Sequence, residues 1–200
     1  MAYTRQWAAV ALLILALVGI SAVQQLGAAE AGPPSGFGGE GPSGGSVTAS
    51  WTAALTAAAG LVVQWLLMAA LFMEASLLSG RRPDYAAGLH VAIWASVPLG
   101  VMATLQIVYM LAGGVIGAPG VSGLVGALPG YGNWPGVARR LTEAAAAQLT
   151  LFWVWQLVLA GFGLRYTLRA RRGAAVFTVL TWAGLVVLGP VVLGLMGGAR

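Results

Sequence analysis

The sequence predicts an all-α, polytopic integral membrane protein with about five transmembrane helices, its N-terminus inside and its C-terminus outside. Three observations predict this class. Of the 200 residues, 59% are hydrophobic and only 8% are charged, whereas a soluble domain carries roughly 25% charged residues. Five apolar stretches are long enough to cross a bilayer, and the arginines are divided unequally between the segments that join them.

The first span is predicted from about Gln6 to Leu26, within a first region of residues 1–26. Arg5, the apolar run after it and Ala29-Glu30-Ala31 imitate a signal peptide with its cleavage site. We interpret the run instead as a helix that is retained. Residues 27–50 are rich in Gly, Pro and Ser, a composition that predicts a flexible outer loop.

Four more stretches reach the length of about 20 apolar residues that a spanning helix needs. They run from about Trp51 to Leu78, Tyr85 to Ala112, Ala144 to Leu168 and Ala174 to Met196. Residues 113–143 are apolar, but Pro119, Pro129, Pro135 and many glycines interrupt them. Such breakers would leave backbone groups unsatisfied in lipid, so this segment is predicted to be an interfacial or re-entrant loop.

The orientation follows from the arginines, because cytoplasmic loops carry an excess of basic residues. With the N-terminus inside, seven arginines fall on the inner side and three on the outer side. The inner ones are Arg5, Arg81, Arg82, Arg165, Arg169, Arg171 and Arg172, and the outer ones are Arg139, Arg140 and Arg200. The clustered arginines at 165, 169, 171 and 172 also predict contact with anionic lipid.

Helix packing is predicted on one face of the third span. Small residues recur there at four-residue spacing, which lets a neighbouring backbone approach closely; they are Gly88, Ala92, Ser96, Gly100 and Thr104. Prolines inside two spans, Pro98 and Pro190, predict kinks because each removes a backbone N–H.

The polar residues predict no catalytic, cofactor or metal site. The glutamines within the spans are predicted to form hydrogen bonds between helices; they are Gln64, Gln106 and Gln156. The single histidine, His90, has no further ligand at metal-binding spacing, so it is interpreted as a hydrogen-bonded helix residue, with a pigment or haem ligand as the alternative. Glu74 lies in an apolar run, where a charge is costly. It is predicted to reach water or to pair with His90, Arg81 or Arg82, a proton relay being the alternative. Nucleic-acid binding is excluded because the arginines lie between apolar runs and form no basic face.

Several segments together resemble the bacterial branch of the YIP1 family, whose members are small five-span membrane proteins. The segments that carry the resemblance are Gly80-Arg81-Arg82-Pro83-Asp84 with the helix from Tyr85 to Pro98, Pro119 to Val125, Leu151 to Leu157 with Gly161, Gly163 and Leu164, and Arg172 to Ala175. The resemblance covers roughly residues 51–198. It implies a four-helix membrane region over 51–200 and leaves the first 50 residues unassigned.

For function, the resemblance implies a non-catalytic accessory or scaffold subunit of a bacterial inner membrane. Its partners would be membrane lipids and another integral membrane protein, with an ABC-type export permease and its adaptor as the first candidate. Two alternatives stay open. One is a stand-alone small transporter or lipid-handling protein, and the other is a minor subunit of a respiratory or photosynthetic complex.

Overall fold

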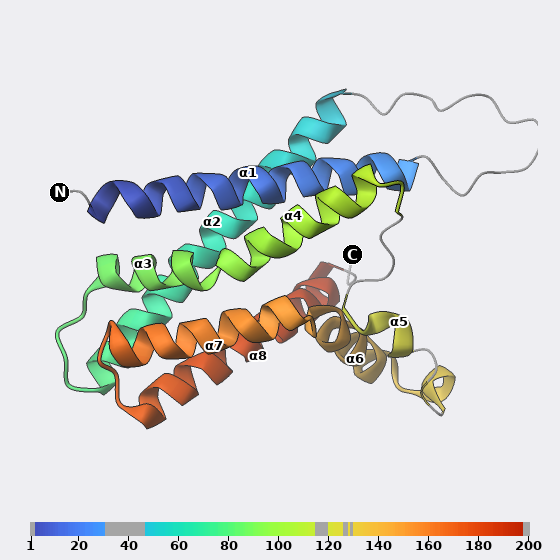
Figure 1. The fold of residues 1–200 in the computed structure, drawn as a ribbon. Coiled ribbons are helices and arrows are strands. Elements are labelled where there is room, and N and C mark those ends of the chain that lie inside the picture. The colour runs from blue at the N-terminus through green and yellow to red at the C-terminus, as the bar shows by residue number, and fades with distance from the viewer. Residues whose placement is uncertain (1–2, 31–46, 115–119, 126–127, 129, 198–200) are drawn as a thin grey trace, which may run out of the picture.

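The computed structural model describes residues 3–30, 47–114, 120–125, 128 and 130–197. All regular secondary structure in these residues is helical (Figure 1). The elements are α1 (Tyr3–Glu30), α2 (Val47–Leu78), α3 (Tyr85–Ala95), α4 (Val97–Leu111), α5 (Ser122–Val125), the 3₁₀ helix η1 (Tyr131–Asn133), α6 (Gly136–Gln148), α7 (Leu151–Tyr166) and α8 (Arg172–Gly197). Most of the loop predicted at 27–50 lies outside the described residues.

The long helices form a bundle in which α2 runs obliquely behind the others (Figure 1). Helix α1 packs on α2 and α4, while α7 packs on α3, α4 and α8. Side chains from α2, α3 and α7 fill the centre of the bundle, and the largest that are fully buried include Met68, Phe72, Ile93 and Leu164. The third predicted span therefore lies at the middle of the fold.

The third span is interrupted at Ser96, which ends α3 and begins α4. Pro98 lies two residues later, in the first turn of α4, where its missing N–H costs least. The sequence predicted a kink at this proline, and the structure has the break between α3 and α4 two residues before it. At the second proline, Pro190, the helix α8 continues without a break.

Three helical stretches among the described residues are long and apolar enough to cross a membrane: Ala54–Leu78, Tyr85–Leu111 and Arg172–Gly189. The pair of α6 and α7 would be a fourth if its two helices form one bent span, and α1 contains a shorter apolar stretch, Ala8–Ser21. These helices confirm the predicted all-α membrane class. The count of five spans and the orientation stay predictions.

The structure differs from the predicted fourth span, Ala144 to Leu168. The chain is helical from Gly136 to Gln148, turns by 76°, and is helical again from Leu151. Thr150 explains the restart, because its side-chain oxygen accepts a hydrogen bond of 3.0 Å from the Trp153 N–H and so caps α7.

Helix α6 occupies the end of the segment predicted as an interfacial loop. Its charged residues Arg139, Arg140 and Glu143 are exposed, as expected for an amphipathic helix in the plane of a membrane interface. The Tyr131 hydroxyl donates a hydrogen bond to Glu143. Desolvation and this bond raise the pKa of Tyr131 above its ordinary value of 10.0.

Candidate functional site

A buried polar cluster joins three helices at the interruption of the third span. Ser96 is 0% exposed, and its hydroxyl accepts a hydrogen bond of 2.9 Å from the indole Nε1 of Trp65 on α2. It accepts a second bond of 3.3 Å from the side-chain amide Nε2 of Gln156 on α7. It donates a third, of 2.9 Å, to the carbonyl of Ala92.

A serine hydroxyl has one hydrogen to donate and two lone pairs that accept. Ser96 therefore uses its complete hydrogen-bonding capacity. The amide nitrogen of Gln156, a residue that is 1% exposed, also lies 3.9 Å from the sulfur of Met68. Polar groups buried inside a bilayer need partners within the protein, so this cluster fixes how α2, α3 and α7 lie against one another.

The sequence analysis found two of the three polar members of this cluster. It placed Ser96 on a packing face and assigned Gln156 to interhelical hydrogen bonding, which the structure confirms. It missed Trp65, which it treated only as part of an apolar span. A tryptophan inside a predicted span could have been the signal, because a buried indole N–H usually has a hydrogen-bond acceptor nearby.

The predicted packing stripe lies along α3 and α4 and faces other helices of the same chain over most of its length. A β-carbon at Gly88 would lie 3.0 Å from the carbonyl oxygen of Ala69 on α2. One at Gly100 would lie 3.2 Å from Ile14 on α1. Ala92 and Ser96 are fully buried between these two positions. Thr104 is exposed, and its hydroxyl donates to the Gly100 carbonyl at 2.9 Å.

The structure does not bring together the groups proposed as an intramembrane polar pair. Glu74, Arg81 and Arg82 are exposed, and among the described residues no ion pair joins Glu74 to either arginine or to His90. The His90 ring lies 6.2 Å from the Trp94 ring and lines a groove of about 510 Å³ between α3 and α7. No group of three or more potential metal ligands occurs in the part of the chain that the structure describes.

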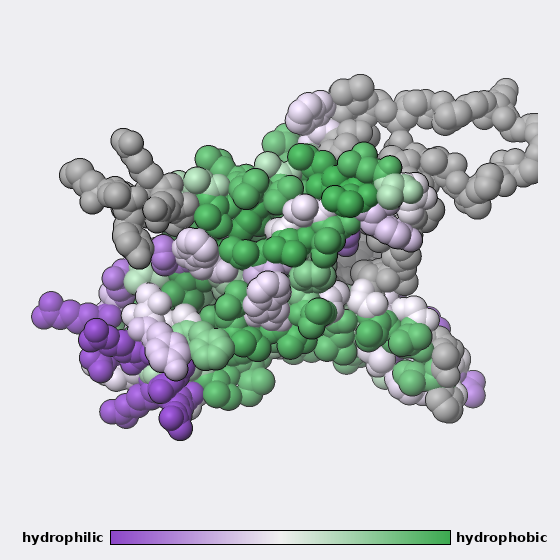
Figure 2. Space-filling model, viewed as in Figure 1, coloured by the Kyte–Doolittle hydropathy of each residue, from purple (hydrophilic) through white to green (hydrophobic). Residues whose placement is uncertain are grey.

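The arginines predicted to contact lipid gather at one end of the bundle, where hydrophilic side chains cover the surface (Figure 2). Arg169, Arg171 and Arg172 are exposed, and Arg165 is half-buried. The loop that carries them is fastened to the end of α2, because the Arg171 N–H donates to the Ser79 hydroxyl at 2.9 Å. The Arg165 side chain donates to the Ala170 carbonyl at 3.0 Å.

A second hollow, of about 580 Å³, lies at the opposite end of the bundle and is lined by residues of α1, α2, α4, α6 and α7. Its polar lining includes Gln64, Gln106 and Gln148. The sequence analysis had assigned Gln64 and Gln106 to interhelical hydrogen bonds only. Trp153 also borders this hollow, and its buried indole nitrogen has no hydrogen-bond partner among the described residues.

The fold and its buried cluster define a polytopic α-helical membrane protein. The family model of the Yip1 domain matches residues 1–194, and the chain belongs to this family. The match confirms the family that the sequence motifs indicated and includes the first 50 residues, which those motifs had left unassigned. The bacterial branch and the five spans stay predictions. Neither a curated protein nor a solved structure matches the chain.

Proposed function

We propose that this protein is a non-catalytic accessory subunit that packs against another integral membrane protein through the exposed face of α2. We further propose that it acts in a bacterial inner membrane and that the partner belongs to an ABC-type export system. The family resemblance supports the identity of the partner. The position of Glu74 supports the choice of the α2 face as the interaction surface.

Glu74 lies on the outward face of α2, beside the exposed side chains of Leu67, Leu77 and Leu78. It is four residues before the end of the helix, which is about 6 Å at 1.5 Å per residue. An ionised side chain at the centre of a membrane helix costs about 2.5–3.5 kcal/mol on insertion scales, and less near the interface. No described residue pairs with Glu74, so a basic or hydrogen-bonding group of a partner helix would offset this cost.

The test is purification of the full chain from native membranes in mild detergent, with mass spectrometry of the proteins that co-elute. We expect an ATPase, permease or adaptor in stoichiometric amount, and its recovery should fall at least fivefold for Glu74→Gln. The matched control is Glu143→Gln, since Glu143 is an exposed acid on α6, and it should retain the partner.

The outcomes separate the two parts of the proposal. Elution of the wild-type chain alone would overturn the accessory role and favour the stand-alone transporter, which a flux assay in liposomes would then detect. Retention of the partner by Glu74→Gln would overturn the assignment of the α2 face while leaving the accessory role in place.

A further inference from the structure

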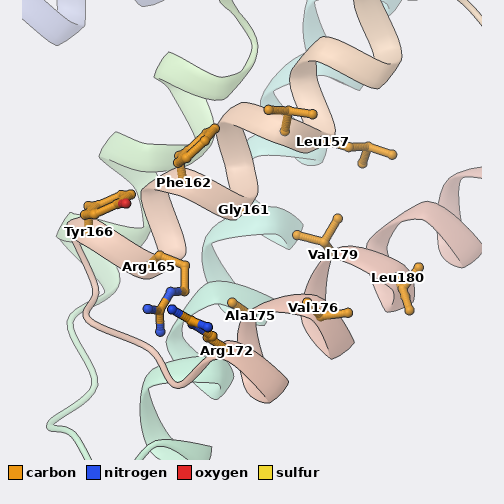
Figure 3. Close-up of a pocket in the computed structure, with 11 residues that line it drawn as sticks. Leu157, Gly161, Phe162, Arg165, Tyr166, Arg172, Ala175, Val176, Val179 and Leu180 are labelled. Carbon is orange, nitrogen blue, oxygen red and sulfur yellow. The ribbon is translucent and has the colours of Figure 1, made fainter.

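A groove of about 450 Å³ runs between α7 and α8. These two helices are consecutive in sequence, and they pack against each other after the short loop between Tyr166 and Arg172. Apolar side chains form most of the lining, among them Val158, Phe162, Val176 and Leu180, and Arg165 and Arg172 complete it at one end (Figure 3).

The apolar lining faces away from the core. Phe162 is 54% exposed and Leu180 is 65% exposed, and α8 is one of the helices long and apolar enough to span a membrane. The groove therefore opens toward hydrocarbon. From Leu157 to Arg165 it follows nine residues of α7. The eight rises between them give a length of roughly 12 Å, which accommodates part of an acyl chain.

The two arginines bring positive charge to the end of this groove without a matching acid. Figure 3 shows both guanidinium groups at the same end, near Tyr166. Arg165 donates to the Ala170 carbonyl, which leaves most of its five N–H donors unused. Among the described residues, no carboxylate lies within ion-pair distance of either side chain. Two like charges at one site are stabilised by an anion between them.

Tyr166 marks the depth of this site in the membrane. It is 74% exposed and its ring stacks on Phe162 at 5.9 Å, and exposed tyrosines gather at the level of lipid headgroups. The exposed Arg169 and Arg171 lie in the adjoining loop. Positive charge thus begins where the apolar groove ends, which is complementary to a phospholipid whose negatively charged headgroup adjoins its apolar chains.

We propose that the α7–α8 groove binds one anionic phospholipid, with the headgroup phosphate held by Arg165 and Arg172 and an acyl chain lying along Val158, Phe162 and Leu180. Guanidinium groups suit this role because they form paired hydrogen bonds to phosphate oxygens. Basic pockets between transmembrane helices bind anionic headgroups by this chemistry. The proposal does not depend on the accessory role of the protein.

The test is native mass spectrometry of the full chain in detergent, titrated with phosphatidylglycerol or with phosphatidylcholine of the same acyl chains. We expect phosphatidylglycerol to bind at least tenfold more tightly. Removing a basic residue should cost about fivefold in affinity, so Arg165→Gln with Arg172→Gln should cost about 25-fold. The control pair Arg139→Gln with Arg140→Gln on α6 should change the affinity less than twofold.

In these lipid titrations, three results would overturn the proposal, and the single variant and the phosphate competition described below each add another. Equal affinity for the two lipids would exclude headgroup recognition, and an equal loss in the α6 control would reduce the effect to overall charge. The third result concerns the acyl chain of the lipid. Gly161→Leu places a side chain in the groove and should weaken lipid binding although both arginines are intact. The control Gly184→Leu, at a position with open space around it, should not weaken binding. If Gly161→Leu binds normally, the lipid lies elsewhere.

Arg165 also holds its own loop, so its replacement can disturb folding. The single variant Arg172→Gln then tests the headgroup site. The Arg172 side chain makes no hydrogen bond to the described residues, so its replacement should not disturb folding. It should lose about fivefold in phosphatidylglycerol affinity, and an unchanged affinity would contradict the proposed site. Inorganic phosphate added in excess should not displace the lipid, because the free anion has no acyl chain to bind the apolar groove. Displacement of the lipid would instead assign the site to free phosphate.

Discussion

The indole N–H of Trp65 donates a hydrogen bond of 2.9 Å to the hydroxyl of Ser96, across 31 residues of sequence. This bond ties α2 to the point at which the third span is interrupted. Because the backbone hydrogen bonding of the third span is interrupted there, the angle between α3 and α4 depends on contacts with neighbouring helices. Ser96 supplies these contacts on two sides, through Trp65 and through Gln156.

Ser96→Ala should destabilise the protein by about 1–2 kcal/mol, because the buried N–H groups of Trp65 and Gln156 lose their common acceptor. Ser76→Ala is the matched control. Ser76 is equally buried, but its hydroxyl donates only to the Phe72 carbonyl of its own helix, and its loss should cost less than about 0.5 kcal/mol. Unfolding in mixed micelles, followed by tryptophan fluorescence, compares the two variants. Equal losses would show that Ser96 is not a special contact.

Gly163→Ala should destabilise the packing of α7 on α3, because a β-carbon at Gly163 would collide with the side chain of Val91. Overpacking of this kind costs about 1–3 kcal/mol. Gly161→Ala, two residues earlier on the same helix, meets only Val179 at 3.9 Å and should be neutral or stabilising by up to about 1 kcal/mol. Thermal unfolding in detergent measures both. A Gly163→Ala protein as stable as wild type would contradict the observed α3–α7 contact.

Ser79→Ala should loosen the loop between α7 and α8, because the N–H of Arg171 loses its acceptor at the end of α2. A lost hydrogen bond of about 1 kcal/mol raises the open population about fivefold. Trypsin cleavage after Arg169 and Arg171 in proteoliposomes reports this population, since cleavage of a loop follows its opening. Ser76→Ala, one turn earlier on α2, serves as the control and should be cut at the wild-type rate.

The orientation predicted from the arginines can be tested directly, because the chain has no cysteine. Asn133→Cys lies in the predicted outer segment and Arg169→Cys in the predicted inner loop, and both positions are exposed. A membrane-impermeant maleimide added to intact cells should label Asn133→Cys and spare Arg169→Cys until the membrane is opened. The reverse pattern would place the N-terminus outside.

The features that the sequence determined by itself are those that arise from neighbouring residues. Hydrophobic runs of spanning length predicted an all-helical membrane protein, and the described helices confirm this class. The proline at position 98 predicted a kink in the third span, and the helix is broken nearby, at Ser96, because the loss of a backbone N–H acts within one turn. Short motifs between residues 51 and 198 were enough to suggest the family that the match over residues 1–194 confirms.

The tertiary structure decided the features that depend on residues far apart in the chain. The hydroxyl of Ser96 meets Trp65 and Gln156 only because three helices converge there, and the hydropathy of the sequence does not indicate which residues of different helices meet. The bend between α6 and α7 depends on the cap formed by Thr150, which competes with an apolar run that otherwise favours continued helix. The α7–α8 groove likewise exists only because two spans pack side by side, which brings Arg165 and Arg172 to one end of an apolar surface.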